Sequence, residues 1–193
     1  ALTLRSAGQA PLPVQVRVFR WTQEAGRENL APATDMVASP PQARLEPGAT
    51  YTVRLVSRGA AAGQERAYRL LVDELPQGDR ARAGTVTMLM RYSIPVFAAG
   101  DGRMPQLAWS ARLSGGELEI RAANSGGRRA RLSRVKASAG GKTVVFAEGL
   151  LGYALAGSEM AWSRPVPAGF KGAVRISGET EAGPFDAAAK LQR

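Results

Sequence analysis

The sequence contains neither histidine nor cysteine, and these two absences narrow its chemistry. Without histidine the chain lacks the commonest general base, and without cysteine it lacks a thiol nucleophile. The same two residue types are the usual ligands of zinc sites. We therefore expect no enzyme, no catalytic residue, no metal site and no cofactor. No disulfide can form, so the cysteine count is compatible with an oxidising or a reducing compartment.

Long hydrophobic runs are absent as well. No segment reaches the roughly 18 apolar residues of a membrane span, and no basic start followed by an apolar stretch marks a signal peptide. We expect neither feature within this chain. Its 193 residues, 45% of them hydrophobic, can bury a core as one large domain or as two smaller ones.

Helical periodicity is scarce, whereas short alternating runs bounded by glycine, proline, asparagine or aspartate recur along the chain. This spacing is typical of β-sandwiches and predicts an all-β fold. A dozen short strands are too many for one small sandwich. The predicted strands are 1–5, 14–22, 50–57, 66–74, 85–96, 107–113, 117–122, 130–138, 142–147, 160–163, 172–177 and 185–191.

A small, polar, glycine- and proline-rich stretch over 98–105 divides the chain into halves of similar length. We place the domain boundary there, with one domain over 1–100 and a second over 104–193. The first half has only about five strong strand predictions, fewer than a seven-stranded sandwich needs. We therefore expect the first domain to lack its N-terminal strand.

The segment Val86 to Phe97 reads as a long strand with two competing faces. One reading is an ordinary core strand. The other is an edge strand, ended by Pro95, that is lent to another chain through main-chain hydrogen bonds and alternate side chains. One row alternates as Val86, Met88, Met90, Tyr92 and Ile94, and the other as Thr87, Leu89, Arg91 and Ser93.

The formal charge of +10 raises nucleic acid as a partner. Most basic residues are scattered, however, and the dense cluster alternates along one predicted strand, which favours a solvated outer face. We therefore expect no nucleic-acid partner. The cluster consists of Arg128, Arg129, Arg131, Arg134 and Lys136.

Aromatic residues make up only 6% of the chain, and three of them support an alternative function. If Trp21, Trp109 and Tyr153 were exposed, they would form the binding platform of a two-domain adhesion or carbohydrate-binding module. The simpler reading of Trp21 is a core or rim residue.

Several motifs in a fixed order cover nearly the whole chain. With them the sequence resembles the periplasmic chaperones of the chaperone/usher pathway, in particular the archaic branch that assembles spore-coat-like pili. The motifs are Val14–Gln23, Ser39–Pro41, Glu46–Gly48, Val53–Leu55, Glu65, Tyr68–Leu70, Asp73–Pro76, Arg91–Phe97, Gly152–Ser158 and Trp162.

The resemblance implies two immunoglobulin-like sandwiches in a boomerang arrangement. It implies a periplasmic chaperone, working without ATP, that caps pilus or fimbrial subunits by donor-strand complementation and delivers them to an outer-membrane usher. Self-association through the donor strand is also expected, since an exposed apolar edge tends to pair.

The resemblance also assigns roles to residues. Val86, Met88, Met90, Tyr92 and Ile94 are the expected donor side chains, although the opposite parity, with Leu89 outward, stays open. Arg91 is expected to anchor the terminal carboxylate of the subunit, the alternative being a solvated or internally paired arginine. The family's second anchoring basic residue would precede Ala1.

Overall fold

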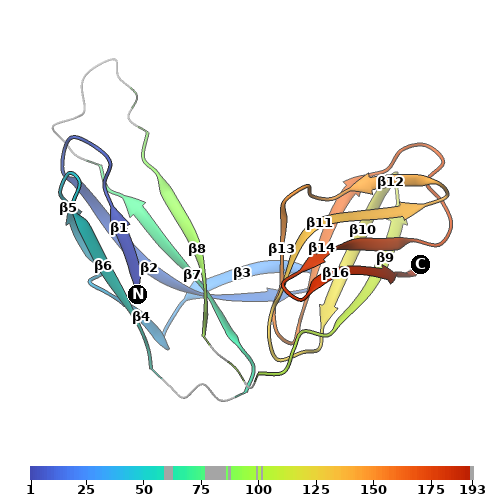
Figure 1. Cartoon of the computed structure of the whole chain (residues 1–193), viewed down its shortest axis with the longest axis horizontal. Helices are drawn as coiled ribbons and strands as arrows, with labels where there is room; N and C mark the ends of the chain where they lie inside the picture. Colours follow the sequence, from blue (N-terminus) through green and yellow to red (C-terminus); the bar gives the residue numbers. More distant parts are fainter. Residues whose placement is uncertain (59–62, 77–85, 87, 99, 101, 192–193) are drawn as a thin grey trace. The chain divides into compact units, whose positions relative to one another are not determined.

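The computed structural model describes residues 1–58, 63–76, 86, 88–98, 100 and 102–191, and these residues form strands and no helix (Figure 1). They divide into two compact units. The first contains residues 1–21, 30–60 and 67–98. The second contains 99–193 together with 22–29 and 61–66, so the end of one long strand belongs to the second unit.

The first unit is a sandwich of two sheets, one ordered β1-β6-β4 and the other β3-β2-β7-β8, with β5 paired to β2. Valines and leucines alternate along these strands, so one face of each sheet is apolar and turns inward. The buried core consists of Val14, Val16, Leu45, Val53, Leu70 and Val72. The strands are β1 (Leu2–Arg5), β2 (Leu12–Glu24), β3 (Arg27–Pro32), β4 (Met36–Ser39), β5 (Gln42–Leu45), β6 (Thr50–Ser57), β7 (Arg66–Glu74) and β8 (Arg91–Ala98).

The second unit is a sandwich of the same kind. One sheet is ordered β14-β10-β9-β17 and the other β12-β11-β15-β16, with β13 paired to β11. Its core includes Trp109, Leu118, Ile120, Leu132 and Ile176. The strands are β9 (Leu107–Ser114), β10 (Glu117–Asn124), β11 (Ala130–Ala139), β12 (Lys142–Val145), β13 (Leu150–Ala154), β14 (Ser158–Pro165), β15 (Arg175–Thr180), β16 (Gly183–Ala188) and β17 (Lys190–Leu191).

One turn of the second unit, which follows β10, is held by the single buried side chain of Asn124. The Asn124 amide nitrogen donates to the carbonyls of Arg128 and Ala154, at 2.7 and 3.0 Å. Its oxygen accepts from the N–H groups of Gln106 and Gly126, at 3.1 and 2.9 Å. A Cβ at Gly126 would collide with the main chain of Met104, so glycine is required there.

The all-β fold and the two immunoglobulin-like sandwiches are confirmed. Strands β3, β4, β5 and β13 were not predicted. All of β3 is exposed, so no inward row of apolar residues marks it in the sequence. Of these four strands, β3, β4 and β5 raise the first unit above the five predicted strands, and the missing first strand stays a prediction.

The predicted strand over 85–96 is wrong in its extent. The observed strand β8 is Arg91–Ala98, and Val86 and Met88–Met90 precede it outside any strand. Thr85 and Thr87 lie outside the described residues. A lone apolar run gains strand geometry only where a neighbour accepts its main-chain hydrogen bonds, and β7 ends at Glu74.

Candidate functional site

An exposed apolar segment precedes strand β8. We call Val86, Met88, Leu89 and Met90 the apolar segment. Their exposed fractions are 92%, 81%, 46% and 48%, in contrast to the core residues of the same unit. Large apolar side chains grouped at one exposed place mark an interaction site more often than singly exposed ones do.

Glu74, the last residue of β7, ties the end of the apolar segment to the sheet. The N–H of Glu74 donates to the carbonyl of Met90 at 3.0 Å. In return the N–H of Met90 donates to Oε2 of Glu74 at 3.2 Å. The chain therefore enters β8 at a fixed register, and β8 is the last strand in its sheet among the described residues.

The two faces of β8 have different surroundings. Ile94 and Val96 pack against the core of the first unit, and Tyr92, on the same face, is half exposed. Ile94 is therefore held partly by its own fold, and its place among the donor side chains stays a prediction. The other four, Val86, Met88, Met90 and Tyr92, are all exposed.

Arg91 begins the opposite face of β8 and pairs with Asp73 of β7. Its Nε donates to Oδ1 of Asp73. The other carboxylate oxygen, Oδ2, accepts from Nε and Nη2 of Arg17 in β2, at 3.1 and 2.7 Å. Two guanidinium groups thus share one carboxylate on the outer face of three adjacent strands, leaving one net positive charge.

Asp73 is nearly buried, whereas the side chain of Arg91 is 62% exposed. Burial raises the pKa of the Asp73 carboxyl, but the hydrogen bonds and charges of Arg91 and Arg17 together outweigh burial and hold it below its usual value. Asp73 therefore stays ionised at neutral pH and orients Arg91. Arg91 is therefore internally paired, which is one of the two alternatives that the sequence analysis left open. The exposed part of the Arg91 guanidinium can still bind a second anion.

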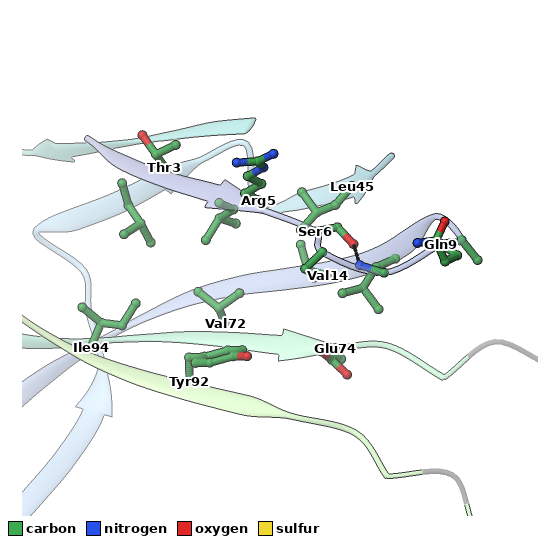
Figure 2. A pocket seen from close by; sticks show the side chains of 16 residues that line it. Thr3, Arg5, Ser6, Gln9, Val14, Leu45, Val72, Glu74, Tyr92 and Ile94 are labelled. Carbon is green, nitrogen blue, oxygen red and sulfur yellow. Dashed lines mark hydrogen bonds between the residues drawn. The ribbon is translucent and has the colours of Figure 1, made fainter. Parts of the chain in front are cut away.

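A cavity of about 780 Å³ opens inside the first unit, between β1 and β8. Figure 2 shows Val72, Tyr92 and Ile94 facing β1 across it. Its walls are mostly apolar, and β1 and β8 are each the last strand of their sheets among the described residues. The groove therefore has an unpaired strand edge on either side.

The aromatic platform of the adhesion-module reading is not present. Trp21 is only 1% exposed, with Phe97 at 6.0 Å between ring centroids and the guanidinium of Arg69 at 3.8 Å from its ring centroid. Trp109 is 6% exposed and stacks on Phe185 at 5.3 Å. Both tryptophans are buried, as the simpler reading of Trp21 predicted.

The basic cluster of the second unit is accompanied by glutamates. Arg129 forms an ion pair of 2.5 Å with Glu65, and Arg134 pairs with Glu179. The main-chain N–H of Arg131 donates to Glu181 at 2.9 Å. These three carboxylates offset much of the cluster's charge, which does not favour phosphate binding.

In the described part of the chain, no three histidine, cysteine, aspartate or glutamate residues gather to hold a metal ion. Among the same residues, no helix has the length and apolar character needed to cross a membrane.

Two immunoglobulin-like sandwiches, the first with an exposed apolar segment at a sheet edge, are the features of a pilus-assembly chaperone. A family model for the pili and flagellar-assembly chaperones, PapD N-terminal domain, matches residues 1–102. The chain belongs to this family of chaperones, which are not enzymes. A search of curated protein sequences finds no match.

Solved structures of chaperones have the same fold. One chain of the CsuC–CsuE chaperone–tip adhesion subunit pre-assembly complex, from the archaic Csu pili of Acinetobacter baumannii, is 29% identical with a TM-score of 0.73; the match covers 99% of this chain and 90% of that one. In the Salmonella enterica complex of SafA pilin with the SafB chaperone, the sequence identity is 17% and the TM-score 0.61, and the match covers 96% of this chain and 86% of that one. The E. coli chaperone DraB is 22% identical with a TM-score of 0.57, and the match covers 98% of this chain and 87% of that one.

Three residues that contact the candidate site were not predicted from the sequence. Arg17, Asp73 and Glu74 fix the position of Arg91 and Met90, yet no role in the site was expected for them. A signal was present in the alternation of β2 and β7: Val16 and Val72 are core residues, so Arg17 and Asp73 fall on the opposite face. Without the strand register, their proximity does not follow from the sequence.

Proposed function

We propose that this protein is a periplasmic chaperone that caps incomplete pilus subunits with its apolar segment and delivers them to an outer-membrane usher. The observation that carries this proposal is the exposure of Val86, Met88 and Met90 immediately before the edge strand β8. The relatives solved as chaperone–subunit complexes support the kind of partner.

The proposed mechanism is strand lending. The apolar segment adopts an extended conformation against the subunit, and its main chain supplies hydrogen bonds while alternate side chains enter the subunit's core. Methionine suits this role because its flexible side chain fills differently shaped pockets. Val86, Met88, Met90 and Tyr92 are the proposed donor side chains, and the opposite parity would use Leu89.

Arg91 is the proposed anchor for the subunit's terminal carboxylate. Its Nε is engaged by Asp73, and the exposed end of the guanidinium, with two Nη groups, can pair with a carboxylate in a bidentate way. Because Asp73 orients Arg91 before binding, less side-chain freedom is lost when the subunit arrives.

Co-purification tests the proposal. The gene and that of a pilus subunit encoded beside it are expressed together in a bacterial periplasm, with a tag on the subunit. We expect a one-to-one complex that Met88→Asp abolishes and Arg91→Ala weakens. Met104→Asp is the matched control, since Met104 is 59% exposed but lies outside the apolar segment.

The two substitutions separate the two parts of the mechanism. A complex that survives Met88→Asp contradicts strand lending by this segment. A complex that depends on Met88 and is indifferent to Arg91→Ala leaves strand lending intact and assigns Arg91 to the internal pair with Asp73. Delivery to the usher is tested separately, by surface display of pili in cells carrying each variant.

A further inference from the structure

The five methionines of the chain differ sharply in exposure. Met88 and Met90, in the apolar segment, are 81% and 48% exposed, and Met104 is 59% exposed. Met36 is 5% exposed in strand β4, and Met160 is partly buried in strand β14. With no cysteine in the chain, the thioethers are its readily oxidised sulfur groups.

Oxidation of a thioether changes the property on which strand lending depends. A two-electron oxidant such as hydrogen peroxide transfers one oxygen atom to the sulfur, its O–O bond breaks, and the oxidant leaves as water. The product, methionine sulfoxide, is polar where methionine is apolar. A sulfoxide that must enter an apolar pocket without a hydrogen-bond partner opposes binding.

We propose that Met88 and Met90 form an oxidation site through which peroxide-type oxidants switch off subunit binding. This inference rests on the proposed function. It follows from the placement of two accessible thioethers among the few side chains that have to be buried in the partner. Methionine sulfoxide is reduced enzymatically, so the switch is reversible.

We expect the first unit to stay folded when Met88 and Met90 are oxidised. Met88 and Met90 precede β8, and neither belongs to the core of the first unit. Met90 is held to Glu74 through its main-chain N–H and carbonyl, not through its sulfur. Oxidation at these two positions therefore removes no packed core side chain.

The test uses the whole protein, limited hydrogen peroxide, and peptide mapping by mass spectrometry. We expect Met88 and Met90 to be oxidised well before Met36. Binding of the subunit to the oxidised protein is then expected to weaken by about tenfold for each buried sulfoxide. Treatment with methionine sulfoxide reductases is expected to restore it.

Leucine variants locate the effect, because leucine has nearly the volume of methionine and is not oxidised. The double variant Met88→Leu/Met90→Leu is compared with itself before and after peroxide, and its own affinity for the subunit is expected to stay the same after the treatment. The control variant Met104→Leu is expected to remain sensitive, like the natural protein.

Three results would overturn the inference: unchanged binding after both sulfurs are oxidised, loss of binding in the peroxide-treated double leucine variant, or oxidation of Met36 at the same rate as Met88. If the untreated protein does not bind the subunit, the proposed function fails first, and the switch fails with it.

Discussion

Replacement of Asp73 by asparagine tests the charge arrangement behind Arg91. The substitution keeps the shape of the side chain and one acceptor oxygen but removes the negative charge that Arg17 and Arg91 share. Charged hydrogen bonds contribute about 1.5–3 kcal/mol each when well shielded. The arginine side chains are 39% and 62% exposed, so solvent screening lowers the expected total loss to about 1–3 kcal/mol at pH 7.

The pH dependence gives the sharper test. The two arginines lower the pKa of Asp73 in the folded protein, so its stabilising contribution is present above the pKa of the unfolded chain. It is lost as the pH falls through the lower folded pKa. Asparagine does not titrate, so the difference in unfolding free energy between the two proteins should narrow from about pH 5 downward.

Urea unfolding followed by tryptophan fluorescence measures this difference. Trp21 lies in the first unit, so Trp109→Phe and Trp162→Phe in both proteins leave one reporter for that unit. The control is Glu46→Gln, since Glu46 pairs with Arg44 at 3.3 Å on the surface and should contribute under about 1 kcal/mol. A loss at pH 7 that stays constant into acid would refute the electrostatic account, as would no loss at pH 7.

Three further predictions concern the apolar segment and the second unit. Met88→Ala should weaken subunit binding by about tenfold or more, because one methionine side chain is no longer buried in the subunit, and should leave the urea unfolding midpoint unchanged. Ile94 is partly buried, so Ile94→Ala should instead lower the free energy of unfolding by about 1–3 kcal/mol. Isothermal titration and urea unfolding would show the reversed pattern if Ile94 were the donor. Gln23→Leu should destabilise the second unit by about 2–5 kcal/mol, because Gln23 donates to the carbonyl of Tyr153 at 2.7 Å and accepts from the N–H of Leu155 at 2.9 Å. The control Gln42→Leu should have little effect, since Gln42 is exposed. Equal urea unfolding midpoints for the two variants would contradict this prediction. The free protein should self-associate as its concentration rises, and Met88→Asp should suppress this in sedimentation velocity runs; association unaffected by the substitution would point to another surface.

The fold class was predictable because a single sequence already contains the alternation of apolar residues and the turn residues on which it depends. The alternation over 14–22 and over 117–122 located β2 and β10, although β2 extends two residues further at both ends and β10 two residues further at its end. Strand β3 was missed because an exposed strand carries no inward row of apolar residues. The strand predicted over 85–96 was too long at its start, because alternation does not reveal where the neighbouring strand ends.

The site was predictable in part. Its apolar side chains stand together in the sequence, so Val86, Met88 and Met90 could be selected as one group. Arg17 and Asp73 lie 56 residues apart and meet Arg91 only through the register of three strands. The burial of Ile94 could not be separated from the exposure of Met90, because both share one parity and differ only in their position along the sheet.

The unpaired edges of β1 and β8 affect how fast main-chain N–H groups of the first unit exchange with solvent. An edge strand bonds its neighbour on one side only, so alternate N–H groups of β1 and β8 point away from their sheets. Strands β2 and β7 are bonded on both sides, and their amides are shielded from water. On the groove side of the sandwich we therefore expect fast deuterium exchange at the outward N–H groups of β1 and β8, and protection that rises from β8 inward to β7 and β2.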